Sequence, residues 1–156
     1  MSRRSFICLK KPLIMTEIKS LQRMLAVQVL YQESINPNDD SSDINKTLID
    51  AVEILKLNKL KTKPNLNFAK KIYSGVSTNN KAIDADILLA LGSSHDFKKF
   101  ENLLQFILKA AVFELKYDNQ LSKKIIISEY LKITDSFYPN NEASLVNGIL
   151  DNIQIN

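Results

Sequence analysis

Residues that could exchange protons or act as nucleophiles are few in this sequence. His95 is the only histidine and Cys8 the only cysteine. A lone histidine in the polar stretch 93–96 fits a capping or solvated role, and one cysteine allows neither an internal disulfide nor the usual ligand set of zinc. Asp84 and Asp86 are two residues apart, so a helix would point their carboxylates in different directions. We therefore expect no catalytic residues, no metal and no cofactor, in a protein that acts by binding.

Positive charge is concentrated toward the beginning of the chain. The first 31 residues hold six basic side chains and one acidic side chain, whereas the whole chain has a net charge of +4. Seven further lysines lie between Glu53 and Asp84 with no acid among them, and from Asp84 onward ten acids outnumber seven lysines. This asymmetry predicts a polyanion as partner of the basic half and a basic protein as partner of the acidic half. The alternative is that these lysines only solvate exposed helices.

Apolar spacing and the small number of turn-forming residues predict an all-α fold of about six to seven helices. The chain has 3 glycines and 4 prolines, and its apolar residues recur three and four positions apart. The run Ile125–Ile127 also fits a buried strand, but the polar residues that follow it favour a helix. Five predicted helices span residues 17–33, 43–55, 66–76, 125–133 and 143–153. A sixth begins at a cap within residues 77–80 and ends at Gly92. The seventh is a long central helix that begins within residues 94–98 and ends at Leu115.

No segment of the sequence approaches the roughly 20 apolar residues that span a bilayer. The basic stretch 3–15 contains apolar residues, but Lys10, Lys11 and Pro12 interrupt it before it reaches the length of a signal peptide. We expect a cytoplasmic protein with no membrane partner, whose residues 1–15 form a basic, disordered tail.

Three segments resemble the NusB family of bacterial transcription antitermination factors, and they occur in the order of that family. The first is Arg23–Tyr31, with its A-V-Q-x-L-Y core, and the second is Ser74–Asn79, similar to the family's G-V-x-x-N segment. The third runs from Leu108 to Asp151 and ends in V-N-G-I-L-D. The resemblance covers about residues 19–153, so Met15 is a candidate for the natural start.

The resemblance implies a single NusB-like domain over 16–156, made of two packed helical subdomains, 16–92 and 93–156. It also implies a boxA-type single-stranded RNA as ligand and the ribosomal protein NusE as partner. The implied setting is an antitermination complex with RNA polymerase on ribosomal RNA operons. The sequence leaves open whether the protein also forms a homodimer.

The matched segments supply the residue types that RNA binding needs: cations for phosphates, planar groups for stacking and amides for base edges. The acidic back half supplies Glu101 and Glu114 as candidate contacts to NusE. For Gly75, both close approach of a phosphate and close helix packing fit the sequence. The candidate RNA-binding residues are Lys19, Arg23, Gln28, Tyr31, Ser74, Gly75, Ser77, Thr78, Asn79, Asn141, Leu145 and Asn147.

Several positions depart from the family pattern. The stretch 19–23 has fewer arginines than many relatives have there, which predicts weaker RNA binding. Ser122 stands where the family commonly has proline and Tyr138 where it commonly has glycine, so the local turns are expected to differ. Asn141 replaces an acid, which removes a charge that would repel phosphate.

Two alternatives remain open at the level of the sequence. The first is a NusB-like RNA-binding module of a ribosomal RNA methyltransferase, of which this chain would be a fragment. The second is a helical scaffold that binds only protein. Salt dependence separates these classes, because an RNA binder loses affinity steeply as salt rises.

Overall fold

A computed structural model describes residues 15–37, 46, 65–118 and 120–155 of the chain. The described residues form helices and turns and contain no strand, as the all-α prediction requires. Two predicted segments lie outside the described residues. They are the tail 1–15, of which only Met15 is described, and the helix around 43–55, of which only Lys46 is described. No helix in the described ranges is long and apolar enough to cross a membrane.

The chain divides into two compact units, 1–73 and 74–156, and the boundary falls inside α3 (Asn67–Thr78). We expected the division after residue 92, but α4 (Asn80–Leu91) packs against the later helices and groups with them. The described part of the first unit consists mainly of α1 (Met15–Ile35) and the beginning of α3. The second unit holds the end of α3, α4, a 3-10 turn η3 (Phe97–Lys99) and the last three helices.

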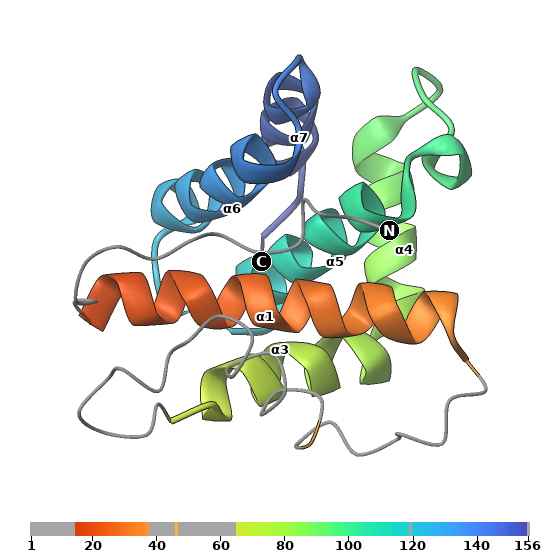
Figure 1. Ribbon diagram of the computed structural model, residues 1–156. Coiled ribbons are helices and arrows are strands. Elements are labelled where there is room, and N and C mark those ends of the chain that lie inside the picture. Colours follow the sequence, from red (N-terminus) through yellow and green to blue (C-terminus); the bar gives the residue numbers. More distant parts are fainter. Residues whose placement is uncertain (1–14, 38–45, 47–64, 119, 156) are drawn as a thin grey trace. The chain divides into compact units, whose positions relative to one another are not determined.

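In the first unit, α1 and the beginning of α3 contact each other (Figure 1). Every residue of α1 from Leu21 to Leu30 is buried, including the polar residues Gln22, Arg23 and Gln28. The apolar periodicity predicts one buried face, which includes Gln28 beside Leu21 and Leu25, but it does not predict the burial of Gln22 and Arg23.

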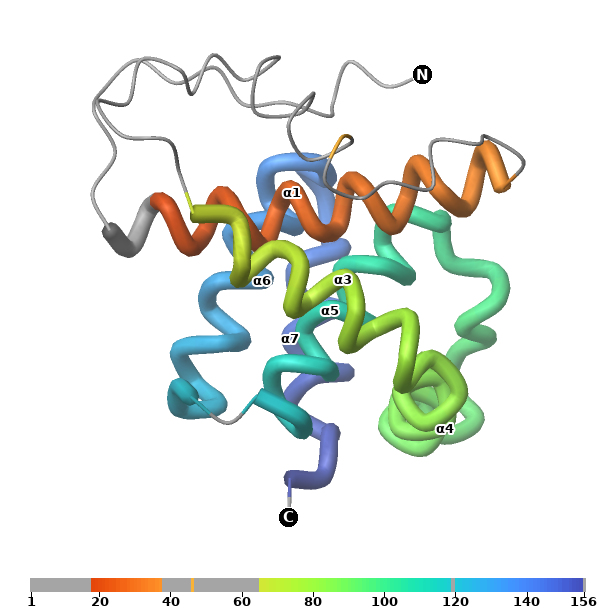
Figure 2. Tube along the Cα trace, turned by 90° about the horizontal axis from the view of Figure 1, so that it is seen from below, coloured from red at the N-terminus to blue at the C-terminus, as the bar shows by residue number. Residues whose placement is uncertain are grey.

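In the second unit, α5 (Asn102–Tyr117) is the central helix, as predicted. It lies between α4 and α6 (Lys123–Phe137) in both views (Figures 1 and 2), and it also contacts α7 (Glu142–Asp151). All residues of α5 from Ile107 to Leu115 are buried. The helical interpretation of Ile125–Ile127 is confirmed, because these residues lie in the first turns of α6.

The beginning of α5 differs from the prediction. The long helix starts at Asn102, and residues 97–99 form the separate turn η3. The Asp96 carboxylate accepts a hydrogen bond from the Lys98 backbone N–H at 3.1 Å, which caps this short turn. The buried ring of Phe97 packs edge-to-face with Phe100, whose extended backbone (ψ 146°) breaks the helical path.

The predicted helix ends are largely confirmed. Gly92 ends α4 with a φ of +61°, and its N–H donates to the Leu88 carbonyl at 3.1 Å. Ser122 caps α6 by accepting from the Ile125 N–H at 3.4 Å, so it replaces the family's proline with a side-chain cap. Tyr138 is buried and extended (φ −129°), a conformation that does not require glycine.

Candidate nucleic-acid interface

Two candidate cations on α1 lie against one aromatic ring of α3. The Lys19 ammonium is 5.3 Å from the centroid of the Phe68 ring, and the Arg23 guanidinium carbon is 5.0 Å from it. Lys19 and Arg23 are four residues apart and therefore share a face of α1. Lys19 is exposed, whereas Arg23 is 2% exposed. Lys19 is thus the cation of this pair that a phosphate can reach directly.

The other two candidates on α1 lie further along the helix. Gln28 is buried and Tyr31 is half-buried. Tyr31 is twelve residues from Lys19, which corresponds to roughly 18 Å of helix at 1.5 Å per residue. The structure therefore does not bring Lys19 and Tyr31 together, and one ligand would need to follow α1 to contact both.

The candidates Ser74, Ser77 and Thr78 are exposed at the junction of α3 and α4, in the second unit. The side-chain N–H of Asn79 donates to the Gly75 carbonyl at 2.8 Å, which stabilises the turn between the two helices. The junction therefore offers exposed hydroxyls, and its asparagine amide is already hydrogen-bonded to the backbone.

Gly75 is where α3 comes close to α5. A Cβ at this position would lie 2.0 Å from Phe113 Cε1 and 2.3 Å from Phe113 Cζ. Real Cβ atoms do not approach other atoms so closely, so Gly75 has a packing role. Of the two interpretations that the sequence left open, the structure supports close helix packing.

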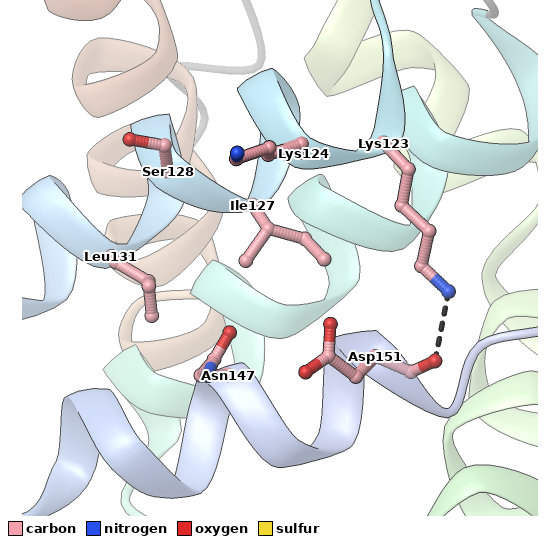
Figure 3. Close-up of a pocket in the computed structure, with 7 residues that line it drawn as sticks. All are labelled: Lys123, Lys124, Ile127, Ser128, Leu131, Asn147 and Asp151. Carbon is pink, nitrogen blue, oxygen red and sulfur yellow. Dashed lines mark hydrogen bonds between the residues drawn. The ribbon is translucent and has the colours of Figure 1, made fainter.

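The candidates on α7 face different surroundings. Asn141 precedes the helix and is exposed, and Leu145 is half-buried. Asn147 is exposed and lines a groove of about 440 Å³ between α6 and α7 (Figure 3). The floor includes the buried Ile127 and the half-buried Leu131.

Figure 3 shows Asn147 and Asp151 reaching from α7 toward α6. Lys123, Lys124 and Ser128 complete the lining of the groove. The Lys123 ammonium donates to the backbone carbonyls of Asp151 and Ile153 at 2.8 and 3.1 Å and so joins α6 to the end of α7. The groove combines an apolar floor with amide, hydroxyl, ammonium and carboxylate groups.

The junction of α3 and α4 and the end of α7 lie at opposite ends of α4. The Asn152 side chain donates to the Ala90 carbonyl at 3.4 Å, near the C-terminus of α4. Asn79 precedes the first residue of α4, eleven positions before Ala90, which is about 16 Å along a helix. The junction of α3 and α4 is therefore far from the point where Asn152 contacts α4.

The two candidate contacts to a partner protein differ in accessibility. Glu101 is exposed just before α5. Glu114 is 2% exposed and accepts a hydrogen bond from the hydroxyl of the fully buried Tyr130. Its carboxylate belongs to the interior of the helical unit, so Glu114 offers no surface to a partner.

Phe68, Lys124 and Asp151 were not among the candidate binding residues predicted from the sequence. The sequence did hold a hint for Phe68, because an aromatic residue near the start of a helix can pack against cations of another helix. Lys124 and Asp151 had no signal of their own, since single charges on helices usually only face solvent.

The described residues hold no group of three or more histidine, cysteine, aspartate or glutamate side chains that could bind a metal ion. His95 is exposed, with its Nδ1 atom 3.1 Å from the Ser94 hydroxyl and its ring against Phe100. This arrangement matches the capping or solvated role expected for a lone histidine.

The described residues form an all-helical protein, and the comparisons identify its family. The model of the NusB family matches residues 20–154. The transcription antitermination protein NusB of Bradyrhizobium diazoefficiens is 29% identical over 152 residues, covering 92% of this chain and 90% of the relative. NusB of Mesorhizobium japonicum is 30% identical over 136 residues, covering 84% of each chain.

A solved structure of NusB from T. maritima has the same fold. It matches with a TM-score of 0.68 at 21% sequence identity and covers 93% of this chain and 92% of its own. The chain belongs to the NusB family, a family of transcription antitermination factors and not of enzymes.

Proposed function

We propose that this protein binds a boxA-type single-stranded RNA together with the ribosomal protein NusE and supports processive transcription of ribosomal RNA operons. The observation that carries the proposal is the family match over residues 20–154. The protein would then act in the cytoplasm, as part of an antitermination complex with RNA polymerase.

For the RNA, we assign the direct phosphate contact on α1 to Lys19, because its side chain is exposed. Arg23 and Gln28 are buried, so their contribution is to hold α1 in place beneath the RNA. Tyr31 offers a half-buried ring for stacking. Ser74, Ser77 and Thr78 offer hydroxyls at the α3–α4 junction, where Gly75 and Asn79 shape the backbone.

On α7, Asn147 supports the proposal because its amide faces a groove with an apolar floor. An amide can read a base edge while apolar side chains contact the base. Asn141 adds an exposed amide without a repelling charge, and Leu145 contributes apolar surface beside it. We propose this end of the protein as a second contact region for the RNA.

For the protein partner, we propose a contact at Glu101. Its carboxylate is exposed near the start of α5, and a basic protein would be attracted to it. Glu114 is not part of the proposed contact, because it is buried.

The experiment mixes the purified full chain with NusE and with either a boxA-type RNA or a scrambled RNA of the same composition. Size-exclusion chromatography with light scattering should show a ternary complex with the boxA-type RNA only, and it also reports any homodimer of the free protein. If the complex with NusE forms to the same extent with either RNA, the result would instead support the alternative of a helical scaffold that binds only protein.

A matched pair of variants tests the NusE contact. Glu101→Lys should weaken NusE binding, whereas Asp135→Lys makes the same charge change at an exposed position on α6 and should not. Equal affinities of the two variants for NusE would remove Glu101 from the proposed contact.

A further inference from the structure

The ring of Phe68 interacts with a buried cation and an exposed one. Arg23 lies 5.0 Å from the ring centroid and is 2% exposed, and Lys19 lies 5.3 Å from it and is exposed. Phe68 itself is half-buried. The electron-rich face of an aromatic ring attracts cations at such distances. Phe68 therefore connects a cation fixed in the protein to one at the surface.

The position of this ring is fixed by the contacts around it. The backbone N–H of Ala69, the next residue, donates to the side-chain oxygen of Gln22 at 3.2 Å. The first N–H groups of a helix have no partner within the helix, and here a buried side chain of α1 supplies one. Gln22 lies between Lys19 and Arg23 in the sequence of α1. The start of α3 is thus tied to α1 at the point where the two cations meet the ring.

We infer that Phe68 is a positioning residue, which holds the exposed Lys19 ammonium in place for an RNA phosphate. The inference rests on the proposed function and adds a residue that the sequence did not identify. A free lysine side chain loses rotamer freedom when it binds a phosphate. A ring that already restricts the side chain lowers that cost, so the affinity for RNA is higher without any new contact to the RNA.

The test compares Phe68→Leu with Phe68→Tyr, since leucine keeps apolar bulk but has no ring and tyrosine keeps the ring. Neither variant changes the charge. A cation–π contact at an exposed position accounts for about a two- to fivefold change in affinity. Phe68→Leu should therefore weaken binding of a boxA-type RNA by about two- to fivefold, and Phe68→Tyr should bind as the wild type does.

A double-mutant cycle with Lys19→Ala distinguishes positioning of Lys19 from a general structural role. If the ring acts through Lys19, then Lys19→Ala should weaken RNA binding less in the Phe68→Leu background than in the wild type. Independent, additive losses would overturn the inference and leave the proposed function standing. A wild-type protein that does not prefer the boxA-type RNA would overturn both.

A second measurement needs only the unmodified protein. The methylene protons next to the Lys19 ammonium should show an upfield ring-current shift in the NMR spectrum of the free protein. Ordinary shifts for a mobile lysine would overturn the inference even if Phe68→Leu fails to fold.

Discussion

The ring of Phe113 lies directly against the backbone of Gly75, with Phe113 Cε1 only 2.0 Å from the place where a Cβ would be. The same ring stacks on Tyr117 at a centroid distance of 6.1 Å and an interplanar angle of 13°. The end of α3 can therefore pack closely on α5 only because residue 75 has no side chain.

Gly75→Ala should destabilise the protein. The added methyl group has to displace Phe113 or separate the two helices, and overpacking of this kind costs about 1–3 kcal/mol. Chemical denaturation should show a lower midpoint with an unchanged slope. A variant as stable as the wild type would show that the two helices can separate freely at this point.

Gly148→Ala is the matched control, because a Cβ at Gly148 would meet nothing within 4 Å. Gly148 lies inside α7, where alanine is favoured over glycine by about 1 kcal/mol. The control should raise the free energy of unfolding. If it also weakens RNA binding, the RNA passes close to this part of α7.

The buried pair of Tyr130 and Glu114 makes a second prediction about stability. The Tyr130 hydroxyl donates to the Glu114 carboxylate, and the two residues are 0% and 2% exposed. Tyr130→Phe removes this donor from a buried carboxylate, which should cost about 1–3 kcal/mol. Thermal unfolding measures the loss, and binding of NusE should be unchanged. If a fully folded Tyr130→Phe variant binds NusE more weakly, Glu114 would have to be counted among the NusE contacts again.

Ion pairs in the second unit should differ in strength according to their burial. Lys116 contacts Asp86 at 2.9 Å, and both side chains are 19% exposed, whereas the Lys132 side chain is 70% exposed beside Glu129. Lys116→Met should cost about 1–3 kcal/mol, because it leaves a largely buried carboxylate without its cation. Lys132→Met removes the same charge and should change the free energy of unfolding by no more than about 0.5 kcal/mol. Urea titrations of both variants test this, and equal losses would contradict it.

The elements that the sequence predicted well are those with strong local signals. Gly92 ends α4 because only a residue without a Cβ adopts its positive φ cheaply, and α5 is central because its apolar residues cover most of its circumference. The start of α5 was misplaced because the cap at Asp96 serves a short turn and not the helix. A cap in the sequence does not reveal how many turns follow it.

The candidate site was predicted by residue type, and burial changed the roles of several residues. Arg23 and Glu114 have the charges of surface residues but are each 2% exposed. Their burial depends on partners that are distant in the sequence, such as Phe68 and Tyr130. Periodicity within one helix cannot reveal such partners.

The two cations of α1 should respond differently to truncation. Lys19→Ala should lower the melting temperature only slightly, because the exposed side chain loses a contact with the Phe68 ring worth about 0.5–1 kcal/mol. It should also reduce the salt slope of RNA binding by about 0.7 for one lost contact to a single strand. Arg23→Ala should weaken RNA binding as well, but with a loss of stability of about 2 kcal/mol or more, because it empties a buried position. Melting curves combined with binding titrations distinguish the two. An Arg23→Ala variant that keeps its melting temperature would contradict the buried role of this side chain.

Sequence-selective RNA binding is tested most directly by the affinity of the full chain for a boxA-type RNA, measured by fluorescence anisotropy from low to physiological salt beside a scrambled RNA. We expect tighter binding of the boxA-type RNA at every salt concentration and a steep loss of affinity for both RNAs as salt rises. Equal affinity for the two RNAs, or no binding at low salt, would contradict the proposal that this protein is a sequence-selective RNA-binding factor.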